Sequence, residues 1–289
     1  MEMRLAAQEE IKAKIIASVD KMPSLPTTVG KIIQLAHDIK SSAKDILAVI
    51  QLDPVVAAKV LKLINSAYYG MPNRVSLSQA VVLLGINTIK NLALSSAIVG
   101  QMGQGAVKIK SFDQHRFWEH SLGTAIVAKA IGKTMGTDPA TVDEFFVAGL
   151  VHDIGKLVMA LFLPMYYSKA LQYAQEKSLT GSDAEMATIG IDHSEVGSQL
   201  AEKWSLNPLL IDSIRYHHRP TEKVGTLTWV VHVANYFVAA QGYDNTGEYG
   251  GNTVEEAAFP SIGLTREVVQ GSLVNLPEEI QKATVFLQT

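Results

Sequence analysis

Apolar residues recur at three- and four-residue spacing along most of the chain, and this spacing predicts helices rather than strands. In the first hundred residues we predict an amphipathic N-terminal helix followed by about five more, over 29–36, 42–50, 54–65, 76–85 and from 87 onward. Three of these carry start signals, because capping boxes begin at Ser42 and Ser76 and a capping Asp53 precedes a proline.

The same spacing continues in the second half, where predicted helices cover 111–135, 139–163 and 164–177, and others start near 182, 207 and 226. Pro164 is expected to end the second of these, since proline cannot continue a helix. Residues 241–253, rich in glycine, asparagine and tyrosine, predict a loop before a short helical tail. No strand pattern of comparable quality occurs, so the fold class is predicted to be all-α.

Glycine and polar residues gather in residues 101–110, which form the best internal boundary. We therefore predict two packed helical lobes, the first over 21–105 and the second, a helical bundle, over 106–240. The N-terminal helix over 1–20 and the loop and tail over 241–289 flank them.

The composition of the chain excludes several classes of protein and of partner. The chain has 289 residues, 47% of them hydrophobic and 18% charged, which excludes disorder as the main state. A net charge of −3 offers no basic surface for nucleic acid or anionic lipid. Uninterrupted apolar runs reach seven residues, against ~18 to 20 for a membrane span. We therefore expect a cytoplasmic protein without nucleic-acid or membrane partners.

The chain contains no cysteine, so any metal must be held by nitrogen and oxygen ligands. The chain has eight histidines, and five of those in the second lobe are candidate ligands, because helices of a bundle can direct such side chains to a common centre. Imidazole and carboxylate ligands suit iron, manganese or zinc, and two such ions bridged by an aspartate promote phosphoester hydrolysis. The candidate ligands are His120, His152, Asp153, His193, His217 and His218.

The doublet His152-Asp153 opens the motif HDIGK, which ends at Lys156. Gly155 in this motif is expected to let two helix backbones approach closely. Lys156 lies one helical turn from His152 and is a candidate phosphate contact.

At these residues the chain resembles the HD superfamily of metal-dependent phosphohydrolases, through His120, HDIGK and the HSEVG segment at His193. The first lobe is similar to HDOD, the HD-related output domain of bacterial signalling proteins, through SLPTTVGKIIQLA, DPVVAAKVLKLINSAYYG and VSLSQAVVLLGINTIKNLAL. The resemblance covers roughly residues 21–240. It implies two packed helical lobes and a regulatory role. Many members of the family are regarded as modules that interact with other proteins.

The retained histidines are also similar in order to those of HD-GYP phosphodiesterases, which hydrolyse cyclic di-GMP. Two departures bear on that activity. The segment after the doublet reads HHRPTEKVG, without a Gly-Tyr-Pro signature, and Asn235 stands where the family has a closing aspartate. An amide oxygen can coordinate a metal, but it supplies no charge and no base. The chain is therefore expected to bind metal even where it does not catalyse hydrolysis.

Each feature also has a plainer interpretation. His152-Asp153 can be a hydrogen-bonded polar pair inside a bundle, and His217-His218 a solvated helix end. Arg215 and Arg219 flank this histidine doublet and are either a phosphate-binding pair or exposed helix-end arginines. Tyr68 and Tyr69 are interpreted mainly as a wedge between the lobes, with a partner-binding surface as the alternative.

Two functional hypotheses follow. The first is a regulatory HDOD protein with one or two transition metals in its second lobe, acting on other signalling proteins or on a nucleotide or phosphorylated small ligand. The second is a metal-dependent phosphohydrolase of nucleotides or cyclic dinucleotides, with Asp153 and Lys156 as its catalytic residues.

Overall fold

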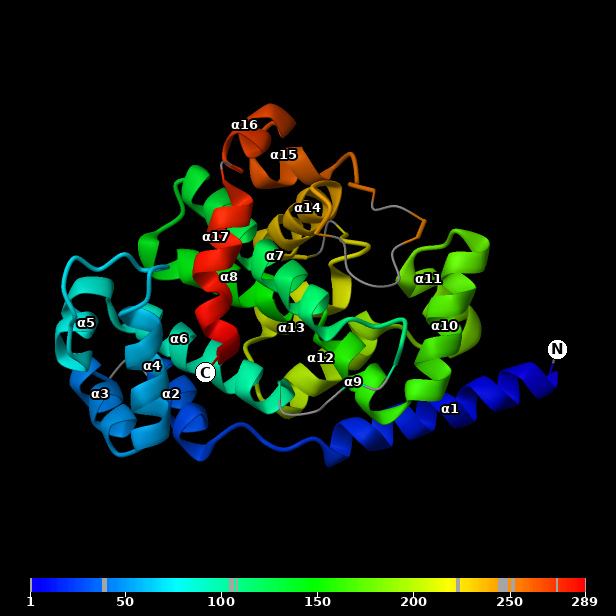
Figure 1. Ribbon diagram of the computed structural model, residues 1–289, viewed down its shortest axis with the longest axis horizontal. Helices are drawn as coiled ribbons and strands as arrows, with labels where there is room; N and C mark the ends of the chain where they lie inside the picture. Colours follow the sequence, from blue (N-terminus) through cyan, green and yellow to red (C-terminus); the bar gives the residue numbers. More distant parts are fainter. Residues whose placement is uncertain are drawn as a thin grey trace.

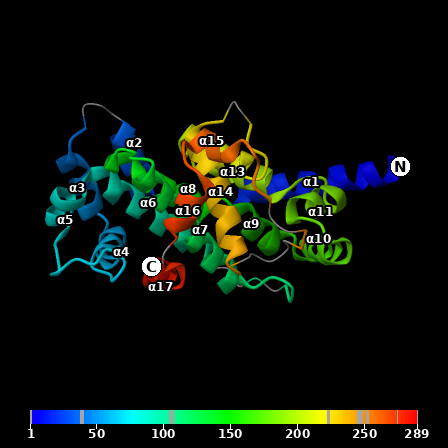
Figure 2. The same ribbon diagram turned by 90° about the horizontal axis from the view of Figure 1, so that it is seen from above.

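The computed structural model describes residues 2–37, 41–103, 107, 109–221, 224–243, 249–250, 253–273 and 275–288. Every regular element within these ranges is a helix, which confirms the all-α prediction (Figures 1 and 2). The helices of the first third are α1 (Glu2–Lys21), α2 (Thr27–His37), α3 (Ala43–Gln51), α4 (Pro54–Ile64), α5 (Leu77–Leu84) and α6 (Ile86–Met102).

The second lobe contains α7 (Gln114–Thr134), α8 (Pro139–Val151), α9 (Ile154–Phe162), α10 (Pro164–Lys177), α11 (Gly181–Thr188), α12 (His193–Lys203), α13 (Pro208–Tyr216) and α14 (Thr226–Ala240). The chain ends with α15 (Ala258–Ile262), α16 (Arg266–Gly271), α17 (Leu276–Ala283) and the 3-10 helix η1 (Thr284–Gln288). Helices α2–α5 lie at one end of the molecule and α10–α11 at the other in both views (Figures 1 and 2).

Local sequence signals set most helix ends as predicted. The capping boxes at Ser42 and Ser76 both form, and the Asp53 side chain accepts from two backbone N–H groups of α4. Gly85 adopts a φ of +80°, a conformation that favours glycine, and α5 and α6 meet there at 118°.

Two helices predicted as continuous are each divided into two in the structure, so these two predictions were wrong. The helix predicted over 139–163 is broken at His152-Asp153 into α8 and α9. The helix starting near 182 is also two helices, α11 and α12, because Gly190 at a φ of +87° ends the first of them. The apolar spacing continues through both breaks, so periodicity alone does not reveal them.

The two lobes share one core. Helix α6 contacts α8, and the C-terminal η1 contacts α4, α6 and α7. The Tyr68 ring lies 5.7 Å from that of Phe146 on α8 and 5.6 Å from that of Phe286 on η1, measured between centroids. This position agrees with a wedge between the lobes. The predicted boundary at 101–110 falls partly outside the described residues.

Helices α8 and α9 together carry the longest apolar stretch, Thr141–Phe162, which has the length and hydropathy of a membrane span. Its most apolar window is 89% buried by the rest of the protein, as expected for a central core helix. Helix α1 runs along the underside of α9 and α12, where Lys203 donates to the carbonyl oxygens of Val19 and Met22 (Figure 1).

Candidate metal centre

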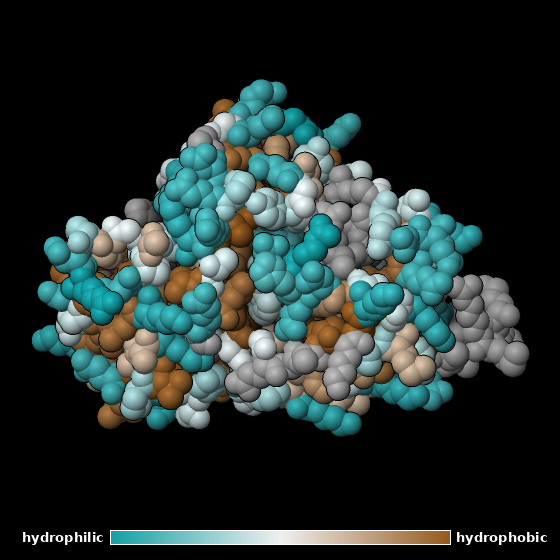
Figure 3. Space-filling model, viewed as in Figure 1, coloured by the Kyte–Doolittle hydropathy of each residue, from teal (hydrophilic) through white to brown (hydrophobic). Residues whose placement is uncertain are grey.

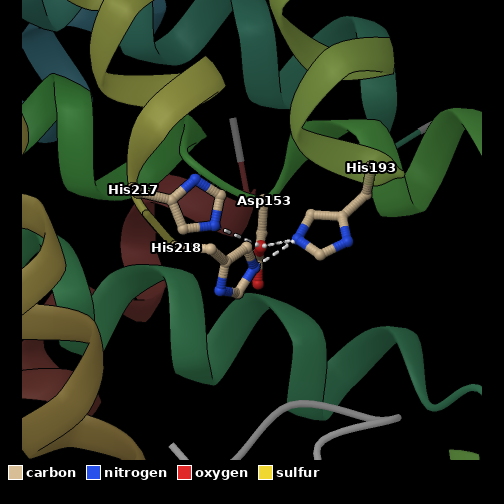
Figure 4. Close-up of side chains that lie close together, drawn as sticks. All are labelled: Asp153, His193, His217 and His218. Atoms are coloured by element: carbon tan, nitrogen blue, oxygen red, sulfur yellow. Dashed lines mark hydrogen bonds and ion pairs between the residues drawn. The ribbon is translucent and has the colours of Figure 1, made fainter. Parts of the chain in front are cut away.

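The carboxylate of Asp153 lies at the break between α8 and α9, in the middle of a group of histidines (Figure 4). Its Oδ1 is 3.1 Å from Nε2 of His193 and 3.4 Å from Nε2 of His217. Its Oδ2 is 3.4 Å from Nε2 of His152 and 3.7 Å from Nε2 of His120. One carboxylate therefore faces two pairs of histidines, one with each oxygen.

Four separate parts of the chain bring these ligands together. His120 comes from α7, the His152-Asp153 doublet from the α8–α9 break, and His193 is the first residue of α12. His217 and His218 follow the last residue of α13. The Asp192 side chain caps α12 by accepting from the backbone N–H of Glu195, which fixes where that helix begins.

Four imidazoles are oriented by hydrogen bonds on their outer side. The acceptors are carbonyl or carboxylate oxygens, which cannot donate, so Nδ1 of each ring carries the proton and Nε2 is the inward-facing ligand atom. The four bonds are His120 to Tyr243 O at 2.7 Å, His152 to Gly149 O at 2.8 Å, His217 to Ile214 O at 2.8 Å and His193 to Glu185 Oε2 at 2.7 Å.

This orientation brings ligand atoms into contact with one another. Nε2 of His120 and Nε2 of His152 are 3.3 Å apart, and Nε2 of His193 and Nε2 of His218 are 2.8 Å apart. Two neutral nitrogens with facing lone pairs repel each other unless a proton or a cation lies between them. Each contact can thus hold a proton or a metal ion, and the candidate ligands form two groups that share Asp153: one with His193, His217 and His218, the other with His120 and His152.

Burial and mutual charge set the protonation of the centre. Burial, with the neighbouring histidines, lowers the pKa of His120 and of His217 to about 4, so both are neutral ligands at pH 7. Burial alone raises the pKa of Asp153, but His152 and Lys156 outweigh it and hold that pKa well below its usual range. The centre thus combines an ionised carboxylate with the neutral imidazoles of His120 and His217, a combination that suits metal binding.

His193 differs from the other histidines, and its pKa leads to a prediction. Burial alone lowers this pKa, yet the facing Glu185 carboxylate raises it to about 10. At pH 8 the metal-free protein therefore holds a proton on Nε2 of His193, which a metal ion must displace. We expect about one proton released per ion bound at this group, with affinity rising about tenfold per pH unit up to pH 10. Calorimetry in two buffers of different ionisation enthalpy measures this release; zero release would contradict the assigned proton.

Lys156 lies within the centre rather than beside it. Its ammonium is 3.0 Å from Oδ2 of Asp153, and its side chain is 2% exposed. It therefore keeps the carboxylate ionised, and its predicted contact with a phosphate stays a prediction.

A cavity of about 140 Å³ adjoins the centre, and among the six candidate histidine and aspartate ligands it is lined by His218 alone. Asn235 and Arg219 also line it, so the structure brings both close to His218. The Arg219 side chain is 74% exposed and pairs with Asp183. Arg215 lies elsewhere, paired with Glu195 and Glu202, and its predicted phosphate contact stays a prediction.

Three contributors lie outside the predicted ligand set. Glu185 orients His193 from eight residues upstream, and the Tyr243 carbonyl orients His120 from the loop after α14. His232 donates from Nδ1 to the His217 carbonyl at 2.7 Å and accepts at Nε2 from the backbone of Glu255 at 3.0 Å. Only His232 had a signal, because it lies one helical turn before Asn235.

Comparison with known proteins decides the family. A family model of the HDOD domain matches residues 22–220. The chain belongs to the HDOD family. An uncharacterized protein of Treponema pallidum is 28% identical over 211 residues, which cover 72% of this HDOD chain and 40% of the relative. Ribonuclease Y of Mycoplasma mycoides is 26% identical over 158 residues, which cover 54% of the chain and 30% of the relative. The chain thus spans less than half the length of these two relatives.

Solved structures share the fold of this HDOD protein. An HDOD domain protein of unknown function from Geobacter sulfurreducens is 27% identical, with a TM-score of 0.78 over 98% of this chain and 97% of that one. A candidate phosphohydrolase from Shewanella amazonensis is 24% identical, with a TM-score of 0.72 over 95% of this chain and 98% of that one. A candidate signal transduction protein from Marinobacter aquaeolei is 21% identical, with a TM-score of 0.77 over 98% of this chain and 66% of that one.

Proposed function

We propose that this HDOD protein is a signalling module that holds two iron, manganese or zinc ions in its second lobe and acts mainly by binding a small phosphorylated ligand or a partner protein. The observation that supports this proposal best is the double ligand group around Asp153, with four imidazoles oriented from outside. When bound, such ions supply Lewis acidity toward a phosphoryl oxygen.

The cavity beside His218 supports a small ligand. Its volume of about 140 Å³ lies well below the roughly 300 to 1,000 Å³ of pockets that enclose drug-sized ligands. It can therefore enclose a phosphoryl group but not a cyclic dinucleotide. Arg219 at its rim can orient such a group as a two-pronged donor, since its ion pair with Asp183 is exposed to solvent.

The regulatory proposal is supported by Asn235. This side chain is 6% exposed and lines the same cavity. As an amide it can accept or donate a hydrogen bond, but it cannot remove a proton from a water molecule. Slow turnover, or none, is expected from a site in which a neutral group lies beside His218.

A metal-dependent phosphohydrolase is the second candidate, and the carboxylate shared between two ligand groups favours it. The variant Asn235→Asp separates the two. If the site lacks only one carboxylate, the variant should release phosphate from 4-nitrophenyl phosphate or adenosine 5′-monophosphate at least about tenfold faster than the unaltered protein.

The same preparations are tested for metal by elemental analysis after purification under low oxygen. Two ions per chain with unchanged phosphate release in Asn235→Asp would favour the binding module and count against the enzyme. Absence of bound metal from the unaltered protein would overturn the metal centre and both candidates with it. A mobility-shift titration at physiological salt tests the expectation that nucleic acid is not a partner.

A further inference from the structure

We propose a second ligand site, at the junction of the two lobes, that binds a small anion carrying a flat aromatic group. A cavity of about 560 Å³ lies there between α5, α7, α8 and α17. Its walls include Tyr68, Tyr69, Leu83, Lys129 and Lys133. Its volume lies within the roughly 300 to 1,000 Å³ typical of small-molecule sites.

The cavity is separate from the metal centre. His120 and Lys129 are nine residues apart on α7, and Asp143 on α8 lies nine residues before His152, the first residue after that helix. At 1.5 Å per helical residue, each pair spans about 13 Å along its helix. The two sites thus lie at opposite ends of the α7–α8 helical hairpin, whose position in the molecule is seen in Figure 1.

Two lysines supply the preference for an anion. Lys129 and Lys133 are one turn apart on α7, and both line the cavity. Like charges at this spacing destabilise a helix unless a counter-charge is bound. Nζ of Lys129 is 2.5 Å from Asp143 Oδ1, which takes one of its three N–H donors. Lys133 has no ion pair within the part of the chain that the structure describes.

The carboxylates that line the cavity already have partners. Besides Lys129, Asp143 accepts at Oδ2 from the Thr88 hydroxyl at 2.5 Å. Glu279 is paired with Lys282, which lies 2.9 Å from both Glu278 and Glu279. Within the described residues Lys133 is thus the cation of this wall that is without an ion pair, and the spare donors of Lys129 lie one helical turn away.

Apolar and aromatic side chains also line the cavity. The rings of Tyr68 and Tyr69 stand edge to face at 5.3 Å, and Lys129 lies 5.5 Å from the centroid of the Tyr69 ring. Leu83 is 62% exposed although it lines the cavity, and Figure 3 shows apolar surface over this lobe and beside its junction with the rest of the protein. A flat ring can lie against these side chains while its anionic group reaches the lysines. This assigns a role to the NSAYYG and AVVLLG segments, which the metal centre does not use.

The test uses adenosine 5′-monophosphate and naphthalene-1-sulfonate as probes, titrated by calorimetry into the full chain. Lys133→Ala, at an exposed position, should weaken the binding of both probes by about tenfold or more, the loss of one charge-assisted hydrogen bond. Leu83→Asp places a negative charge, like that of the probes, at the exposed edge of the cavity, and it should weaken the binding of both probes to a similar extent. Circular dichroism verifies that each variant is folded.

Arg219→Ala is the matched control, because it removes a cation from the cavity at the metal centre and leaves the inter-lobe cavity unaltered. Binding of naphthalene-1-sulfonate should be unchanged in this variant. The proposal is overturned if neither probe saturates below about 5 mM, or if Arg219→Ala removes binding while Lys133→Ala and Leu83→Asp leave it intact. Either result leaves the metal centre and its function untouched.

Discussion

Replacing Asp153 with alanine is expected to remove both metal ions at once. Its Oδ1 and Oδ2 serve different histidine pairs, so the substitution takes one ligand from each group and removes the only carboxylate that the two described groups contain. It also withdraws the carboxylate from the Lys156 ammonium, which is almost completely buried. Breaking a buried ion pair in this way costs about 3 to 5 kcal/mol.

The measurement is elemental analysis of protein purified under low oxygen, together with thermal unfolding. His120→Ala should lose one ion and keep the other, because His120 belongs to a single group. His115→Ala controls for adventitious binding, since this histidine is exposed and pairs with Glu119 outside the centre. Two ions retained by folded Asp153→Ala protein would show that the carboxylate is not a shared ligand.

The sequence predicts which side chains gather at the centre better than it predicts the contacts that orient them. The sequence predicts a shared centre, and the structure brings its six candidate ligands together: His120, His152, Asp153, His193, His217 and His218. Residue chemistry limits strong ligands to imidazole and carboxylate in a chain without cysteine, and the resemblance to the HD superfamily distinguished these histidines from His115 and His232. Helix positions were likewise predictable where a capping residue coincided with apolar periodicity.

The contacts that orient the ligands could not be predicted in the same way. Glu185 resembles any solvent-facing acid in its helix, and only the packing of α11 on α12 places it against His193. The Tyr243 carbonyl belongs to the backbone, so no side-chain pattern marks it. Apolar spacing continues from α8 into α9, so the sequence does not reveal the break between them. The His152-Asp153 doublet occupies this break. Tertiary contacts decide all three.

The close approach predicted for Gly155 is present, and it makes Gly155→Ala the second substitution with a large expected effect. An added Cβ would overlap the His193 carbonyl oxygen and lie 2.7 Å from the backbone nitrogen of Gly197. Both obstacles are backbone atoms of α12, so no rotamer change relieves the overlap. We expect a loss of about 3 kcal/mol or more, seen as a fall in Tm of roughly 5 to 10 °C.

The same substitution should weaken the metal centre, because α9 follows Asp153 directly and α12 begins at His193. Forcing these helices apart lengthens the 3.1 Å contact between the Asp153 carboxylate and Nε2 of His193, so metal content should fall together with Tm. Gly30→Ala is the matched control: this glycine lies in α2 with nothing within 4 Å of an added Cβ. In a helix that change stabilises by about 0.5 to 1 kcal/mol. A Gly155→Ala protein with unchanged Tm and full metal content would mean that α9 and α12 do not need this close contact to hold the ligands.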